Sequence, residues 1–80
     1  SNPCNPTGTM YTEKELRALG EVFKRHPQIL IVSDEIYEYI SFTEKMFSIG
    51  SIPELQNRTV TVNGLSKGFA MTGWRLGYLG

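Results

Sequence analysis

The chain has 80 residues, and its eight basic and eight acidic side chains give a formal net charge of zero. This balance argues against a nucleic acid or an anionic membrane surface as the main partner. No apolar run approaches the roughly 20 residues of a membrane span, so we expect no membrane insertion. Cys4 is the only cysteine, which rules out an internal disulfide and fits a reducing, cytoplasmic setting.

The length allows one small domain or a piece of a larger one. The chain begins on the turn sequence Ser1-Asn2-Pro3 and ends inside an apolar run at residues 76–80, and both features indicate a fragment. A domain of this length buries only about two thirds of the surface that its unfolded chain exposes. A piece of a sheet also leaves edges unpaired, so we do not expect these residues to fold stably alone.

A helix is predicted after a turn-rich start at residues 1–10. Thr12 suits the N-cap, and Glu15 three residues later completes a capping box. Apolar residues then recur at helical spacing and predict one stripe that faces a core: Leu16, Leu19, Val22 and Phe23. The last turn is basic, as the helix dipole favours, and Pro27 ends the helix. We interpret the lone His26 as a surface residue of this last turn, and we predict no metal site.

Two strands and a possible third are predicted after the helix. Residues 29–32 are four consecutive apolar residues, the pattern of a strand buried on both faces of a parallel sheet. Residues 34–40 are predicted as a short helix or a turn that leaves this strand. Residues 41–58 are predicted to be irregular and polar, with one helical turn among them. Residues 59–63 form the second predicted strand, and residues 75–79 form the possible third.

Lys67 and Arg75 are the only charged side chains in the glycine-rich and apolar segment of residues 63–77. Loss of hydration favours the neutral amine and lowers the pKa of a lysine in such surroundings. Lys67 is therefore a candidate nucleophile for Schiff-base chemistry. The alternative is a lysine at a strand end that raises its ammonium group to solvent. Taken alone, so short a motif favours this alternative.

Candidate ligands follow the predicted strands. A crossover connection makes consecutive strands parallel, and open α/β sheets bind ligands at the edge where the carboxyl ends of their strands meet. Asp34 and Tyr37 follow the first strand, and Ser66 and Lys67 follow the second. Asn5 would lie at the same edge if a strand precedes Ser1. Asp34 could instead cap a helix, Tyr37 could be a packing aromatic and Asn5 a turn former. Their coincidence on one edge favours a binding site.

Together these side chains complement pyridoxal 5′-phosphate. Arg75 and Ser66 suit its phosphate group. Lys67 suits its aldehyde, and Asp34 suits its cationic ring nitrogen. Asn5 and Tyr37 suit its phenolate oxygen. This complementarity makes all six residues candidates for binding the cofactor, with Lys67 as the candidate nucleophile.

Three blocks of the sequence resemble the class I and II aminotransferases of the fold type I pyridoxal-phosphate enzymes. The blocks are NPCNPTG at residues 2–8, SDEIYE at residues 33–38 and SKGFAMTGWRLGY at residues 66–78. They occur in the family order and at family-like separations, so the resemblance covers essentially the whole chain. Within the family, the sequence is most similar to bacterial and plant-plastid aspartate or prephenate aminotransferases.

The resemblance implies a role for each predicted residue. Lys67 would hold the cofactor as a Schiff base and move the proton between the substrate Cα and C4′ of the cofactor. Asp34 would keep the ring nitrogen protonated, Tyr37 and Asn5 would bind the 3′ oxygen, and Arg75 would bind the phosphate with Ser66. The resemblance also makes Asn5-Pro6 a candidate cis peptide. Gly64 stands where many members have a phosphate-binding Ser, although one sub-group has Asn-Gly at this place.

For the fold, the resemblance implies an α/β structure. Residues 1–80 would be an incomplete three-layer αβα piece of the mostly parallel sheet in the cofactor-binding large domain, without the second domain. The full-length protein would be a cytoplasmic, homodimeric aminotransferase that moves an amino group between an aspartate-like amino acid and a 2-oxo acid, whereas the isolated fragment would be inactive. The three blocks leave open a C–S lyase or an aminocyclopropane-carboxylate synthase on the same scaffold, or a non-catalytic truncated module.

Overall fold

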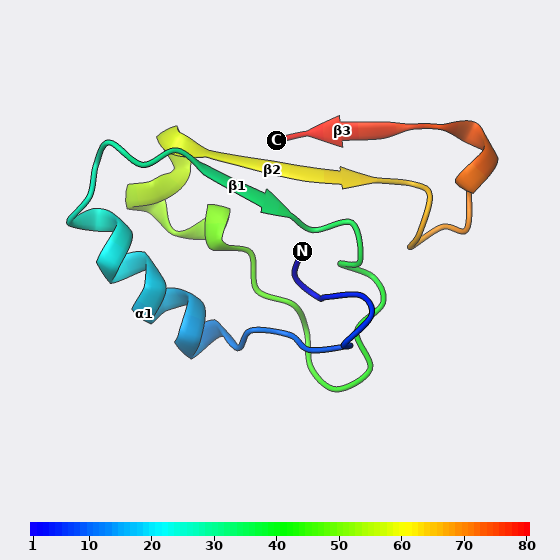
Figure 1. Ribbon diagram of the computed structural model, residues 1–80, viewed down its shortest axis with the longest axis horizontal. Coiled ribbons are helices and arrows are strands. Elements are labelled where there is room, and N and C mark those ends of the chain that lie inside the picture. The colour runs from blue at the N-terminus through cyan, green and yellow to red at the C-terminus, as the bar shows by residue number, and fades with distance from the viewer.

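The computed structural model describes residues 1–80, the whole chain (Figure 1). It has one α-helix, α1 (Glu13–Lys24), and three strands, β1 (Ile31–Asp34), β2 (Thr59–Gly64) and β3 (Gly77–Leu79). Three short 3₁₀ helices complete the structure: η1 (Ile49–Ser51), η2 (Pro53–Arg58) and η3 (Thr72–Trp74). No helix combines the length and the apolar character that a membrane crossing requires.

The three strands form one sheet in the order β1-β2-β3. β1 and β2 are parallel, with Asp34 opposite Val62, and β3 returns antiparallel to β2, with Gly77 opposite Gly64 (Figure 1). The predicted parallel pairing of the first two strands is therefore confirmed. The connection between β1 and β2 contains a turn and the two short helices η1 and η2, with no α-helix.

The start of α1 is set by the predicted capping box, which the structure confirms. The Glu15 amide donates to the Thr12 hydroxyl at 3.2 Å, and the Thr12 amide donates to the Glu15 carboxylate at 2.8 Å. These two bonds satisfy donors that the first helical turn leaves without intrahelical partners. The Thr12 backbone and hydroxyl also hold the pKa of the Glu15 carboxyl below its ordinary value of 4.5.

The end of α1 and the start of β1 both differ from the prediction. The helix ends at Lys24, so Arg25 and His26 lie beyond it. The first strand begins at Ile31 instead of residue 29, because the Ile29 amide turns back to the His26 carbonyl at 3.1 Å. The Arg58 guanidinium stabilises this turn: it donates to the carbonyls of Phe23, His26 and Ile29 at 2.5 to 3.0 Å.

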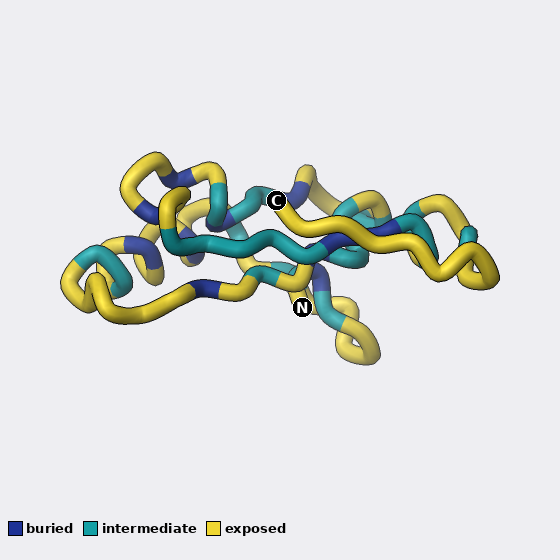
Figure 2. Tube along the Cα trace, turned by 90° about the horizontal axis from the view of Figure 1, so that it is seen from above, coloured by how far each residue is buried: buried dark blue, intermediate teal, exposed yellow.

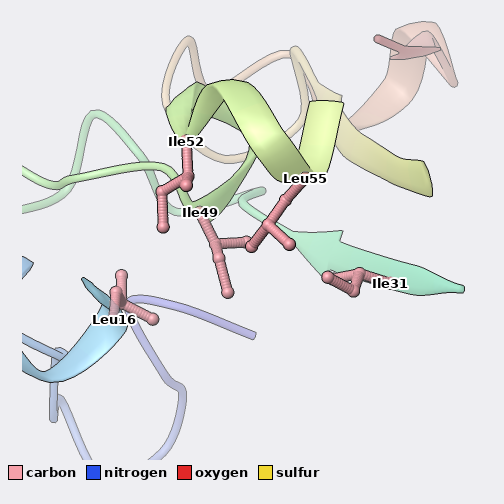
Figure 3. Close-up of a cluster of buried hydrophobic side chains, with 5 residues drawn as sticks. All are labelled: Leu16, Ile31, Ile49, Ile52 and Leu55. Atoms are coloured by element: carbon pink, nitrogen blue, oxygen red, sulfur yellow. The ribbon is translucent and has the colours of Figure 1, made fainter. Parts of the chain in front are cut away.

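One face of the sheet carries the hydrophobic core (Figure 3). The core side chains come from α1, β1, η1 and η2 and their connection: Leu16, Ile31, Ile49, Ile52 and Leu55. Gly20 lets α1 approach this cluster, since a Cβ atom there would lie 2.9 Å from Ile52 Cδ1. The predicted apolar stripe of α1 is only partly covered, because Leu19 and Val22 each remain 40% exposed.

The opposite face of the sheet has no cover within these residues. Val32 is 65% exposed and Leu79 is 70% exposed, and Figure 2 shows β3 as exposed throughout its length. The expected burial of residues 29–32 on both faces is therefore wrong for this chain. The 80 residues supply one layer of helices and the sheet of the expected αβα arrangement.

The capping box predicts a pH dependence of α1 stability. Since the folded carboxyl of Glu15 has a lowered pKa, its stabilisation is present above pH 4.5 and is lost as the pH falls through the lower folded value. The hydrogen-exchange protection factors of the α1 amides, taken relative to the intrinsic exchange rate at each pH, should fall on acidification, and Glu15→Gln should remove that component. Glu44→Gln, at an exposed carboxylate outside any ion pair, should leave it unchanged. An unaltered acid response in Glu15→Gln contradicts this role.

Leu55 should be the most sensitive position of the core, because its side chain is 0% exposed. Leu55→Ala should lower the free energy of unfolding by about 2–5 kcal/mol, since it removes buried methyl groups and leaves a cavity. The volume-conserving Leu55→Met should cost less than about 1.5 kcal/mol. Denaturant titrations of the two variants, made in the whole protein, measure both values. Equal costs would show that the site relaxes around the smaller side chain.

Candidate active site

Three of the six predicted site residues line one cleft of about 410 Å³: Asn5, Tyr37 and Lys67. The N-terminal loop of residues 3–10 and the loop of residues 40–43 form the rest of its wall. The turn after β1 and the loop after β2 begin at the same edge of the sheet, at the right of Figure 1. Parallel pairing thus brings Tyr37 and Lys67 to one cleft, and the N-terminal loop adds Asn5, which is hydrogen-bonded to Tyr37.

The N-terminal loop holds Asn5 against the turn after β1. The loop is closed by hydrogen bonds from the Cys4 amide to the Thr9 carbonyl at 2.9 Å and from the Gly8 amide to the Cys4 carbonyl at 2.8 Å. Gly8 has φ of +72°, which favours glycine at this position. The Asn5 side-chain amide then donates to the Tyr37 hydroxyl at 3.1 Å. The predicted cis peptide at Asn5-Pro6 is confirmed, and Asn2-Pro3 is also cis.

Asp34 is the last residue of β1 and lies outside the cleft wall. Its backbone carbonyl accepts from the Asn2 amide at 2.9 Å, and one carboxylate oxygen accepts from the Ile36 amide at 3.1 Å. It therefore caps the turn at residues 36–39 and not a helix. The second carboxylate oxygen makes no hydrogen bond within the chain, so it is available for a cationic group.

Lys67 lies in the loop after β2, with its carbonyl bound by the Ala70 amide at 3.1 Å. Its amine nitrogen is 5.8 Å from the centre of the Tyr37 ring. The Lys67 side chain is exposed. The desolvation that we expected from the apolar flanks is therefore not supplied by the residues of this chain.

Ser66 and Arg75 stand on either side of the β2–β3 connection. The Leu65 amide donates to the Leu76 carbonyl at 3.1 Å, so Ser66 and Arg75 are the next residues outward on the two arms. No hydrogen bond joins their side chains. The exposed Arg75 has φ of +52°, and its guanidinium donates to the Thr72 carbonyl at 3.1 Å.

Gly64 has a packing reason to differ from the Ser that many family members carry. A Cβ atom at this position would lie 2.9 Å from the Leu76 carbonyl oxygen and 3.1 Å from Ile36 Cδ1. The first distance is shorter than side chains normally tolerate, so the glycine permits close contact between β2, β3 and the turn after β1. With glycine at this position, the hydroxyl that precedes Lys67 in the loop is that of Ser66.

Three polar residues at this edge were not among the predicted site residues: Glu35 and Asn63, which are buried, and Glu38, which is half-buried. Glu35 is 3% exposed and accepts hydrogen bonds from the hydroxyls of Ser33 and Ser48. Asn63 is 4% exposed, and its amide donates to the Glu38 carboxylate at 2.6 Å. Their common signal in the sequence is their place just past, or at the end of, an apolar strand.

The donor set fits pyridoxal 5′-phosphate by its chemistry. Lys67 offers an amine for an aldehyde, and Asp34 offers a free carboxylate oxygen for a protonated ring nitrogen. Tyr37 and Asn5 together offer hydrogen-bond donors for an anionic ring oxygen. Ser66 and Arg75 offer a hydroxyl and a guanidinium for a phosphate. Lys67, Tyr37 and Asn5 line one cleft in the structure, whereas Asp34, Ser66 and Arg75 lie outside its wall.

Comparison with known proteins is consistent with this chemistry. The sequence model of the family described as aminotransferase class I and II matches residues 1–80. The chain is 55% identical over 80 residues to the aspartate aminotransferase of Bacillus subtilis. It is 52% identical over 79 residues to the bifunctional aspartate aminotransferase and glutamate/aspartate-prephenate aminotransferase of Petunia hybrida. Each alignment covers 98% of this chain.

Solved structures give the same relationship for the fold. The aspartate aminotransferase of Rhizobium meliloti aligns with 98% of this chain at a TM-score of 0.92 and 45% identity. The chain covers 20% of that structure, 20% of the Bacillus protein and 16% of the Petunia protein. It therefore spans a fifth or less of these relatives. Because the family model matches its whole length, the chain belongs to the aminotransferase class I and II family.

Proposed function

We propose that the whole protein containing this chain is a pyridoxal-phosphate-dependent aminotransferase that exchanges an amino group between an amino acid and a 2-oxo acid. The observation that carries the proposal is the shared cleft of Asn5, Tyr37 and Lys67, in which Asn5 and Tyr37 are hydrogen-bonded. The relatives named as aspartate or prephenate aminotransferases support aspartate as the first substrate to test. We further propose that these 80 residues are part of its large domain and that it acts as a cytoplasmic homodimer.

Bound pyridoxal 5′-phosphate supplies an aldehyde that captures amines and a ring that accepts electron density. Lys67 would hold the aldehyde through its amine. Once a substrate amine takes that place, the Lys67 nitrogen would be free to hold the proton from the substrate Cα. The centre of the Tyr37 ring lies 5.8 Å from this amine.

The remaining residues orient the cofactor and set its charge. The free carboxylate oxygen of Asp34 stabilises a proton on a ring nitrogen, because an adjacent negative charge favours the cationic form. The Asn5 amide fixes the Tyr37 hydroxyl, which can donate its own proton to an anionic ring oxygen. Arg75 and Ser66 hold a phosphate through charge-assisted and neutral hydrogen bonds.

Lys67→Ala should abolish covalent cofactor binding in the whole protein. Wild-type protein incubated with pyridoxal 5′-phosphate and then reduced with borohydride should carry the label on Lys67, as peptide mass spectrometry would show. Lys45→Ala, at an exposed lysine outside the cleft wall, should leave the labelling intact. A label on another lysine in the wild type would rule out the assignment. Incubation with aspartate and 2-oxoglutarate, followed by product analysis, distinguishes transamination from a lyase or synthase reaction.

Tyr37→Phe should raise the pH at which the visible absorbance of the bound cofactor titrates. The lost hydroxyl is a donor to the anionic ring oxygen, and hydrogen bonds to charged groups contribute about 1.5–3 kcal/mol. Since one pKa unit corresponds to about 1.4 kcal/mol, the expected shift is about one to two units. Spectrophotometric titration measures it, with Tyr11→Phe, at an exposed tyrosine outside the cleft wall, as the control. A midpoint that does not move contradicts the contact.

A further inference from the structure

We propose that Glu38 and Asn63 are a pair of positioning residues that hold the turn carrying Tyr37 against the loop carrying Lys67, an inference that rests on the proposed function. Glu38 directly follows Tyr37 in the turn after β1. Asn63 is the penultimate residue of β2, four positions before Lys67. A hydrogen bond between these two side chains therefore joins the two segments that must meet at the cofactor.

Both polar atoms of the Asn63 side chain make hydrogen bonds within the chain. Its nitrogen donates to the Glu38 carboxylate at 2.6 Å, and its oxygen accepts from the Gly64 amide at 2.8 Å. Asn63 is 4% exposed, so water cannot readily replace either partner. A hydrogen bond to a carboxylate is shorter and stronger than one between neutral groups. Loss of the Glu38 contact would leave a buried donor unsatisfied.

The turn and the loop are each held by their own backbone hydrogen bonds. A contact between one residue of each therefore positions the whole turn relative to the whole loop. In the turn, the Glu38 amide donates to the Glu35 carbonyl and the Ile40 amide donates to the Tyr37 carbonyl, each at 2.8 Å. In the loop, the Met71 amide donates to the Leu65 carbonyl at 3.2 Å. The Glu38–Asn63 bond is the only side-chain hydrogen bond between the turn at residues 35–40 and the segment at residues 63–71.

Close packing surrounds this bond. A Cβ atom on Gly68 would lie 2.8 Å from Tyr39 Cδ2, and the rings of Tyr39 and Phe69 meet edge to face with centres 5.2 Å apart. Such packing brings the turn and the loop into contact, but an aromatic edge can slide along its neighbour. The directional Glu38–Asn63 bond fixes the register, and with it the 5.8 Å separation of the Lys67 amine and the Tyr37 ring.

The experiment uses the whole protein and a pair of substitutions that break and then restore the bond. Asn63→Asp keeps an oxygen for the Gly64 amide but places a second carboxylate against Glu38, so it should push the turn and the loop apart. Glu38→Gln keeps a neutral acceptor for Asn63 and should have a much smaller effect than Asn63→Asp. When both substitutions are combined, the new amide at position 38 can donate to the new carboxylate at position 63 and restore the contact with reversed polarity. Asn57→Asp, at an exposed position of η2, is the matched control for the added charge.

Pyridoxal 5′-phosphate alone is the probe, with affinity and the absorbance titration as readouts. Asn63→Asp should weaken binding by about tenfold or more, an amount equal to the loss of one good polar interaction, and it should displace the titration midpoint. The double variant should recover both properties. The inference is overturned if Asn63→Asp binds and titrates as the wild type does. It is also overturned if the double variant regains thermal stability but not affinity.

A readout without cofactor separates this inference from the proposed function. In cofactor-free protein with labelled lysine, nuclear Overhauser contacts between the Lys67 side chain and the Tyr37 ring should disappear in Asn63→Asp and return in the double variant. If the wild type shows these contacts but never carries the cofactor on Lys67, the proposed function fails while the positioning pair stands. If the contacts persist in Asn63→Asp, the pair has no positioning role.

Discussion

The parallel pairing of β1 with β2 is the constraint on which the candidate site depends. Its register sets Asp34 opposite Val62, and the Glu35 amide continues the ladder to the Val62 carbonyl at 2.8 Å. Both strands therefore end at the same level, and the turn after one lies beside the loop after the other. A shift of one residue would turn every side chain of β1 to the opposite face of the sheet. Ile31 would leave the core, and Asp34 would change sides.

The core holds this register from one face only. Ile31 packs with Leu16 of α1 and Leu55 of η2, so burial of one side chain decides which face of β1 points inward. Arg58 adds a polar link, because it gathers three backbone carbonyls between α1 and β1. The Ile31 core contacts and the Arg58 hydrogen bonds lie at the start of the strands, whereas the candidate site lies at their carboxyl ends. Packing and chemistry thus occupy opposite ends of the same short sheet.

Local features of the fold could be predicted from the sequence because their causes are local. The capping box of α1 requires only Thr12 and Glu15, three positions apart. The strand pattern, the turn after β1 and the parallel pairing also follow from short-range patterns and from the rules of chain connection. The start of β1 could not be predicted, since it depends on Arg58, which lies 29 positions beyond Ile29.

The candidate site also has features that could be predicted from the sequence and features that depend on contacts between distant residues. Residue type identified Asn5, Tyr37 and Lys67, which the structure brings to one cleft. The buried polar residues Glu35 and Asn63 also lie just past, or at the end of, a strand, but this position does not reveal that their side chains are buried and bonded to other residues of the chain. Their burial is a product of strand register and of close contact at Gly64 and Gly68. Such contacts exist only after the turn and the loop have met.

The exposure of Lys67 separates two requirements of Schiff-base chemistry. An amine must be placed correctly, and it must lose hydration before its neutral form is favoured. This chain provides placement, through the Glu38–Asn63 bond and the packing of Tyr39 on the loop. It does not provide burial, because Lys67 lies at the surface of these 80 residues. If Lys67 binds the cofactor as proposed, its desolvation would come from the cofactor itself or from parts of the whole protein that these 80 residues do not include.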